Sequence, residues 1–173
     1  MSVVCSRNPH ERAVDRTIYD EGVRVIAGMY RSRLLTAPAG LSTRPTMDRL
    51  RETLFNVLAA RVAGSFFGDL FAGSGANGIE ALSRGAEEVY FIESAPRAVA
   101  AIRANLKTLG IESGFRIEAV TVGAWLRRQA GAAGRSGDER TGSTGKLDIV
   151  FLDPPYEDEE AYAGTLNLLG GEC

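Results

Sequence analysis

The stretch that decides the fold of this chain is FFGDLFAGSGANG, residues 66–78. Its first half, Phe66 to Phe71, has the aromatic and aliphatic content of a buried strand, and glycine dominates its second half. Ile79 and Leu82 predict a helix directly after the last glycine. Glycines let the backbone approach a ligand closely, and a helix N-terminus favours anionic groups. We therefore expect a ligand-binding turn between a strand and a helix.

The sequence beyond this turn repeats the alternation of strand and helix. The expected strands are residues 66–71, 89–92, 115–120 and 147–152, and the expected helices include one from Pro96 to Gly110, which buries Val99, Ile102 and Leu106, and one around Trp125 and Leu126. The strand at 147–152 is nearly all apolar, which predicts burial on both of its faces. Repeated β-α units predict an α/β fold with a mostly parallel sheet, right-handed crossovers and helices on both faces.

The N-terminal third differs from this pattern. Residues 23–27 and 34–35 flank Gly28–Arg33 and predict a short hairpin. A helix is expected over residues 47–60, and the spacing of its apolar residues predicts that the buried face carries Leu50, Leu54, Val57 and Leu58. Residues 1–22 are expected to be a disordered extension, and the glycine-rich residues 131–145 a flexible surface loop.

Composition excludes several classes of protein. A chain of 173 residues with 45% hydrophobic and 24% charged residues has the size and make-up of one globular domain, not of a fibre, a coiled coil or a disordered tail. It contains no apolar run long enough to span a bilayer and no signal segment. Two cysteines and one histidine, His10, indicate neither a disulfide scaffold nor a metal site nor a Ser-His-Asp triad. We expect a cytoplasmic protein.

Charge is distributed unevenly along the chain. Residues 1–63 hold ten Arg against six acidic residues, whereas residues 64–173 hold ten basic and sixteen acidic residues. The guanidinium group suits phosphate, so the basic third is consistent with an anionic-polymer surface. Because the whole chain has 18 Arg and 2 Lys, a general preference for Arg explains the same pattern equally well.

The glycine loop matches a cofactor-binding fingerprint. Gly73, Gly75 and Gly78 have the GxGxxG spacing, and Glu93 follows 20 residues after Gly73, where a ribose-binding carboxylate is expected. The spacing alone fits a nicotinamide cofactor, S-adenosylmethionine or a turn without a ligand. Asp69 favours S-adenosylmethionine, because a carboxylate beside the loop would repel a pyrophosphate and attract the α-ammonium of a methionine moiety.

A second motif, Asp153-Pro154-Pro155-Tyr156, follows the strand at 147–152. Ligands of open α/β sheets bind outside the carboxyl ends of the strands. Two prolines make a rigid extended turn that offers carbonyl groups without competing N–H donors. A carboxylate, a carbonyl and an aromatic ring suit a planar base with an exocyclic amine, which donates hydrogen bonds to Asp153 and the Pro154 carbonyl while Tyr156 stacks on the ring.

The two motifs together resemble amino-group methyltransferases that use S-adenosylmethionine. Three further blocks are similar to the bacterial RsmD-type enzymes, which methylate the N2 amine of a guanine in small-subunit (16S) ribosomal RNA. These blocks are RVIAGMYR at 24–31, STRPTMDRLRETLFN at 42–56 and EALSRGA at 80–86. The resemblance runs from about Arg24 to Tyr156. It implies a Rossmann-like methyltransferase fold and a basic hairpin and helix that face RNA.

The resemblance also implies roles for individual residues. The target base would be held by Asp153, Pro154, Pro155 and Tyr156. The cofactor would be held by Thr46, Asp69, Phe71, Ala72, Gly73, Ser74, Gly75, Glu93, Ser94 and Thr121, the last in place of an acidic residue common in the family. The RNA would be contacted by Arg24, Arg31, Arg33, Arg44 and Arg49. We expect 16S rRNA or a small-subunit assembly intermediate as partner, no metal, no membrane, and a monomer if the chain is complete.

The resemblance also implies how the chain is organised, and other functions remain as alternatives. Residues 23–173 would form one methyltransferase domain, with 23–62 facing RNA and 63–173 binding the cofactor. The family continues after Tyr156 through a helix and further strands, so the chain is expected to be C-terminally truncated, with its fourth strand at an exposed edge. The alternatives are methylation of another amine such as adenine N6 in DNA, an NAD-binding oxidoreductase, and a non-catalytic ribosome- or RNA-binding remnant.

Overall fold

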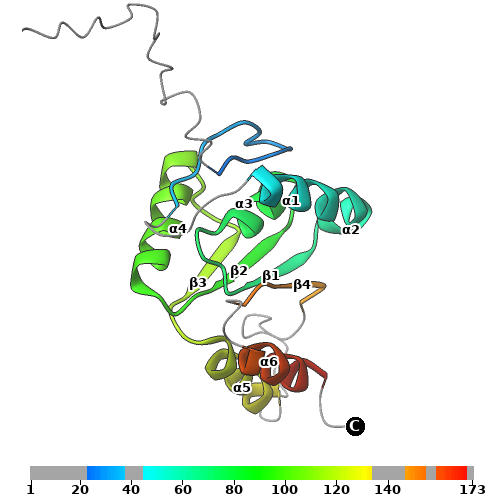
Figure 1. Ribbon diagram of the computed structural model, residues 1–173, viewed down its shortest axis with the longest axis vertical. Coiled ribbons are helices and arrows are strands. Elements are labelled where there is room, and N and C mark those ends of the chain that lie inside the picture. The colour runs from blue at the N-terminus through cyan, green and yellow to red at the C-terminus, as the bar shows by residue number, and fades with distance from the viewer. Residues whose placement is uncertain (1–22, 38–44, 134–146, 155–158, 171–173) are drawn as a thin grey trace, which may run out of the picture.

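A computed structural model describes residues 23–37, 45–133, 147–154 and 159–170. Four parallel strands form one sheet in the order β3-β2-β1-β4 (Figure 1). The strands are β1 (Phe66–Leu70), β2 (Glu88–Ile92), β3 (Phe115–Glu118) and β4 (Ile149–Leu152). The helices are α1 (Pro45–Val57), α2 (Ala59–Val62), α3 (Ala76–Ser83), α4 (Pro96–Leu109), α5 (Val122–Ala133) and α6 (Glu159–Gly170). The predicted α/β fold with a parallel sheet is confirmed.

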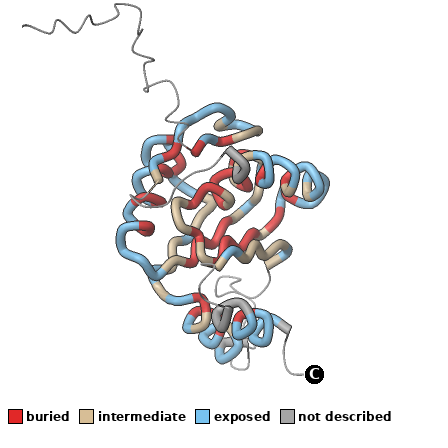
Figure 2. The backbone as a smooth tube through the Cα atoms, viewed as in Figure 1, coloured by how far each residue is buried: buried red, intermediate tan, exposed pale blue. Residues whose placement is uncertain are grey.

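Helices cover both faces of the sheet. Figure 1 shows α1, α3 and α4 on one side and α5 with α6 on the other. Alternate residues of β2 enter two separate cores: Val89 and Phe91 pack with the first group of helices, whereas Tyr90 and Ile92 pack with Trp125 of α5. The central strands β1 and β2 are therefore the most deeply buried part of the sheet (Figure 2).

The position of β4 corrects one prediction. β4 pairs with β1 from Phe67↔Ile149 to Leu70↔Leu152 and lies at the edge of the described sheet. All four of its residues are half-buried, so the expected burial on both faces is wrong for this strand. The apolar composition of β4 reflects its contact with β1 and with both cores, in which its residues are partly buried.

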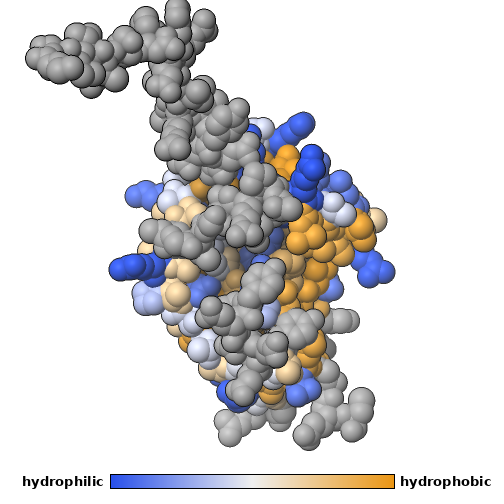
Figure 3. Space-filling view, in the orientation of Figure 1, coloured by the Kyte–Doolittle hydropathy of each residue, from blue (hydrophilic) through white to orange (hydrophobic). Residues whose placement is uncertain are grey.

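The buried face of α1 also differs from the prediction. Leu50 and Val57 are 70% and 79% exposed, whereas Arg51 and Phe55 are buried. Phe55 stacks on Phe67 of β1, with 5.9 Å between ring centroids, and this contact turns the helix so that Leu50 and Val57 face outward. Figure 3 shows the resulting hydrophobic surface on the side of the molecule that carries α1 and α2.

The predicted N-terminal hairpin is present in residues 23–37. Arg24 and Leu34 form an antiparallel bridge, and the backbone N–H of Leu35 donates to the Val23 carbonyl at 2.7 Å. The side chains of Val25 and Leu35 are buried in the core beside α1, α3 and α4. The hairpin is thus packed onto the domain along its length.

Several expectations fall outside the described residues. They concern residues 1–22, most of the loop at 131–145, and the side chains of Arg44, Thr46, Pro155 and Tyr156. The division of residues 23–173 into an RNA-facing part and a cofactor-binding part stays a prediction. Among the described helices, none combines the length and the hydrophobicity that a membrane span requires.

Candidate active site

The glycine loop turns sharply between β1 and α3. Phe71, Gly73 and Gly75 all have positive φ, at 64°, 55° and 78°. A Cβ on Gly75 would lie 3.1 Å from Ile102, and one on Gly78 would lie 2.2 Å from the Phe91 ring. These two glycines are required because the loop lies against the core. A Cβ on Gly73 would meet nothing within 4 Å, so this part of the loop faces open space.

Asp69 lies under this loop, on the face of β1 that also carries Phe67. It is 1% exposed, and its Oδ2 accepts a hydrogen bond from the backbone N–H of Gly78 at 2.8 Å. Its Oδ1 is buried without a partner among the described residues. Burial raises the pKa of Asp69 to about 8; Asp153 and Glu93 act in the same direction, while the Gly78 N–H and Arg51 oppose them.

Glu93 closes the other side of the loop. Its Oε2 accepts from the backbone N–H of Gly73 at 2.8 Å, and its Oε1 accepts from the N–H of Ala95 at 2.8 Å. Each carboxylate oxygen has a second lone pair, so Glu93 can hold the loop and still accept from a ligand hydroxyl. Ser94, beside it, is exposed.

Asp153 directly follows β4 at the same edge of the sheet. Because Leu152 pairs with Leu70 in parallel register, Asp153 and Pro154 lie next to the start of the glycine loop. The residue is exposed, yet partial desolvation of its carboxyl group raises the pKa of Asp153. The carboxylates of Asp69, Glu93 and Asp153 thus gather at the carboxyl ends of three neighbouring strands. In the described part of the chain no group of such side chains could hold a metal ion.

Thr121 lies further away, after β3. Its Oγ1 accepts from the backbone N–H of Ala124 at 3.3 Å, which is the hydrogen bond of a helix N-cap at the start of α5. The sequence analysis missed this capping role. The residue is exposed, and its predicted contact with the cofactor stays a prediction.

Four predicted RNA-contacting residues lie in the described part of the chain, and all four are exposed: Arg24, Arg31, Arg33 and Arg49. The guanidinium of Arg33 donates to the carbonyl of Thr108 at the end of α4, at 3.4 Å. Arg51, from the same basic stretch, is buried instead. It pairs with Asp48 at 2.7 Å and donates to the Arg24 carbonyl at 2.7 Å, so its role is to join α1 to the hairpin.

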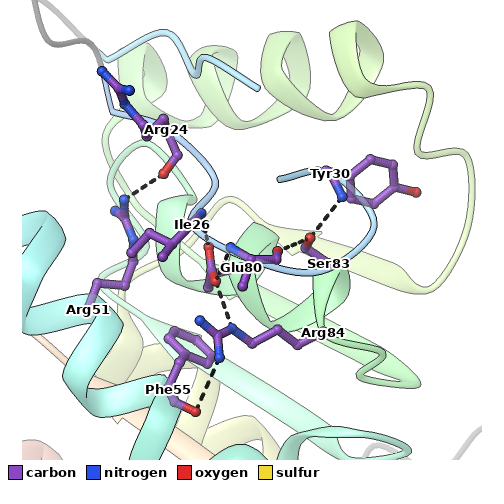
Figure 4. A network of polar contacts seen from close by, with 9 residues as sticks. Arg24, Ile26, Tyr30, Arg51, Phe55, Glu80, Ser83 and Arg84 are labelled. Atoms are coloured by element: carbon purple, nitrogen blue, oxygen red, sulfur yellow. Dashed lines mark hydrogen bonds and ion pairs between the residues drawn. The ribbon is translucent and has the colours of Figure 1, made fainter. Parts of the chain in front are cut away.

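A buried polar network that the sequence analysis missed attaches the hairpin to α3 (Figure 4). Glu80 is fully buried and accepts from the backbone N–H groups of Ile26 at 2.7 Å and Ala27 at 3.0 Å. Its Oε1 also pairs with Arg84 at 2.7 Å, and the Arg84 guanidinium lies 5.2 Å from the centre of the Phe55 ring. The spacing of Glu80 and Arg84, one helical turn apart, is the signal that could have predicted a shared buried face.

Ser83 completes the attachment one turn along α3. Its hydroxyl accepts from the backbone N–H of Tyr30 at 2.9 Å and donates to the Ala27 carbonyl, while its own carbonyl accepts from the N–H of Met29 at 2.8 Å. The backbone of the hairpin is therefore held by the side chains of Glu80 and Ser83 and by the Ser83 carbonyl.

Comparison with known proteins places this geometry in a family. The family described as Conserved hypothetical protein 95 matches residues 23–172. The chain belongs to this family. It is 39% identical over 142 residues to "Putative rRNA methyltransferase YlbH" of Bacillus subtilis, covering 82% of this chain and 71% of that protein. It is 36% identical over 147 residues to "Ribosomal RNA small subunit methyltransferase D" of Escherichia coli, covering 85% of this chain and 66% of that protein.

A solved structure agrees with this membership of the Conserved hypothetical protein 95 family. The "Putative methyltransferase yhhF from Escherichia coli" superposes with a TM-score of 0.68 at 33% identity, covering 86% of this chain and 71% of that one. The predicted resemblance to the RsmD-type enzymes is confirmed. The chain is also 37% identical to the "Ribosomal RNA small subunit methyltransferase D" of Haemophilus influenzae. It spans less than two thirds of the length of the Escherichia coli and Haemophilus influenzae proteins, at 66% and 64%.

Proposed function

We propose that this chain transfers a methyl group from S-adenosylmethionine to the exocyclic N2 amine of a guanine in small-subunit (16S) ribosomal RNA. The observation that carries the proposal is the parallel pairing of β4 with β1, since it brings Asp153 and Pro154 beside the glycine loop. The names of the relatives support ribosomal RNA of the small subunit as the substrate class.

The residues of the loop fit the cofactor. The unpartnered Oδ1 of Asp69 is a buried acceptor that an α-ammonium group could satisfy. Glu93 has acceptor capacity left for ribose hydroxyls, and Gly73 leaves the space in which a ligand could lie. We therefore propose Asp69, Glu93 and the loop from Phe71 to Gly75 as the cofactor-binding residues. When bound, S-adenosylmethionine supplies an activated methyl group on a sulfonium.

Asp153 and Pro154 would hold and orient the target amine. The lone pair of an exocyclic guanine nitrogen is delocalised into the ring, so orientation and proximity carry most of the rate enhancement. The Asp153 carboxylate and the Pro154 carbonyl would accept the two N–H groups and direct the lone pair away from themselves. As the new N–C bond forms, the methyl–sulfur bond would break and leave a neutral thioether, so the positive charge would pass to the amine. The Asp153 carboxylate would then take the proton that the amine loses. The raised pKa of Asp153 suits that role.

The exposed arginines of the hairpin and α1 would bind the RNA backbone. Arg24, Arg31, Arg33 and Arg49 project from elements that are packed together on one side of the sheet. Such contacts would position the RNA, whereas the motif from Asp153 to Tyr156 would select the unstacked base.

The test is a transfer assay with the whole chain. The protein is incubated with radiolabelled S-adenosylmethionine and small ribosomal subunits from a strain that lacks the modification, and the labelled nucleoside is identified by mass spectrometry. Label in N2-methylguanosine of 16S rRNA is the expected result. Label in N6-methyladenine of a DNA control would favour the alternative amine. Binding of the protein to the particles, with neither transfer of label nor binding of the cofactor, would favour a non-catalytic RNA-binding role.

A further inference from the structure

One buried side chain, Asn105 of α4, joins the hairpin segment to the glycine loop. Asn105 is 2% exposed. Its Nδ2 donates to the carbonyls of Thr36 and of Ser74, both at 3.0 Å, and its Oδ1 accepts from the backbone N–H of Thr36 at 2.7 Å. Thr36 lies at the C-terminal end of the hairpin segment, and Ser74 lies at the centre of the loop that is proposed to bind the cofactor.

These three hydrogen bonds connect the two segments through one planar amide group. Both N–H groups of the Asn105 amide are used, one on each segment, and the amide is planar, so its orientation at one carbonyl determines its orientation at the other. Loss of a hydrogen-bond partner by a buried amide lowers the stability of the folded state by about 1–3 kcal/mol. A shift of the backbone at Thr36 therefore either breaks a buried hydrogen bond or turns the amide and carries the Ser74 carbonyl with it.

The Ser74 carbonyl matters because the loop has little freedom of its own. Ser74 lies between Gly73 and Gly75, which both have positive φ, and the N–H of Gly75 already donates to the Ala72 carbonyl at 2.7 Å. The space beside Gly75 is limited by Ile102 and Phe91. Turning the Ser74 peptide thus changes the direction of the loop's backbone groups on its open side.

The hairpin end of this connection carries the exposed arginines. Arg33 donates to the Thr108 carbonyl, about one helical turn beyond Asn105 on α4. A phosphate bound by Arg33 would compete with that carbonyl. The same hairpin also contacts α3, which begins where the glycine loop ends, through Glu80 and Ser83. A ligand on the hairpin is therefore connected to the loop through Asn105 and to the helix that follows the loop through Glu80 and Ser83.

We propose that Asn105 is a positioning residue that couples RNA binding at the hairpin to S-adenosylmethionine binding at the glycine loop, so that each ligand strengthens the binding of the other. The inference rests on the proposed function. Such coupling is reciprocal, and an effect of about fivefold or more on each affinity is expected.

The experiment measures cofactor affinity by calorimetry with and without a saturating amount of small-subunit rRNA that already carries the modification, so that no methyl transfer consumes the cofactor. The wild-type chain should bind S-adenosylmethionine at least about fivefold more tightly when RNA is present. In Asn105→Ala the ratio should fall towards one, while the affinity for RNA alone changes little. Hydrogen exchange of the amides in residues 72–78 provides a second readout: RNA should slow it in the wild type and not in the variant.

A matched pair of variants at Thr36 keeps the test independent of the stability of Asn105→Ala. Thr36 is exposed, so Thr36→Ala removes only a surface side chain, whereas Thr36→Pro also removes the N–H that donates to Asn105. The coupling should persist in the alanine variant and be lost in the proline variant. Unchanged coupling in both Asn105→Ala and Thr36→Pro would overturn the inference while leaving the proposed function intact. A wild-type chain that binds no cofactor would overturn both.

Discussion

The Oδ2 of Asp69 accepts a 2.8 Å hydrogen bond from the backbone N–H of Gly78, and this bond connects the end of β1 to the first turn of α3 across the glycine loop. The residue that was expected to bind the cofactor is therefore also a structural part of the loop. Its second oxygen, Oδ1, remains available within the described structure. The two roles use different atoms of one carboxyl group.

The buried Asp69 should make the ligand-free protein less stable as the pH rises. Its pKa is about 8 in the folded state against 3.8 as the reference for the unfolded chain, so between these values the folded state retains a proton that the unfolded state has lost. The free energy of unfolding should then fall by up to about 1.4 kcal/mol per pH unit. Urea denaturation of wild type and Asp69→Asn between pH 4 and pH 8 measures this. The prediction would be wrong if the free energy of unfolding depended on pH in the same way in both proteins.

Asp153→Ala should lose methyl transfer and keep cofactor binding. Asp153 lies at the edge of the site and makes no hydrogen bond to the glycine loop among the described residues, so its removal leaves the loop intact. We expect turnover to fall about a hundredfold or more, because a positioned acceptor and proton-transfer group is lost. Single-turnover assays measure the rate of methyl transfer, and calorimetry measures the affinity for the cofactor. Asp153→Asn, which retains one acceptor oxygen, should be less impaired in RNA binding than in transfer.

Replacing Arg31 and Arg33 by Ala should weaken RNA binding and reduce its dependence on salt. Each lost phosphate contact lowers the slope of log K against log salt by about 0.7–0.9, because fewer counterions are released. A double variant of Arg127 and Arg128 in α5 has the same charge change at the end of the molecule opposite the hairpin (Figure 1). Equal effects of the two double variants would show that the hairpin is not the contact.

Glu80→Gln should destabilise the domain by about 2–3 kcal/mol, because the half-buried Arg84 loses its charged partner and the hairpin amides lose a charge-assisted acceptor. Equilibrium unfolding in urea measures the change. Glu87→Gln is the control, since Glu87 is exposed on the loop after the same helix. A loss of stability at Glu87 as large as that at Glu80 would contradict the role of the network.

Local patterns in the sequence predicted most of the fold. Glycines, prolines and apolar periodicity placed β1, β2, α3 and α4 within a few residues of where they lie. Periodicity did not predict the buried face of α1, because Leu50 and Val57 satisfy the same spacing as the residues that are buried. The stacking of Phe55 on Phe67 of β1 determines which face of α1 is buried, and this contact is with a different element.

The sequence by itself determined that a glycine loop, an acidic residue and an Asp-Pro-Pro-Tyr motif follow three strands, because these features depend on local composition and spacing. Only the tertiary structure decided that Glu80 and Asn105 connect these parts. A buried polar atom needs a partner, and here the partners are distant in the chain: Asn105 reaches Ser74 across 31 residues and Thr36 across 69. No local pattern encodes which backbone carbonyl will satisfy a buried amide, since that depends on how the helices pack on the sheet.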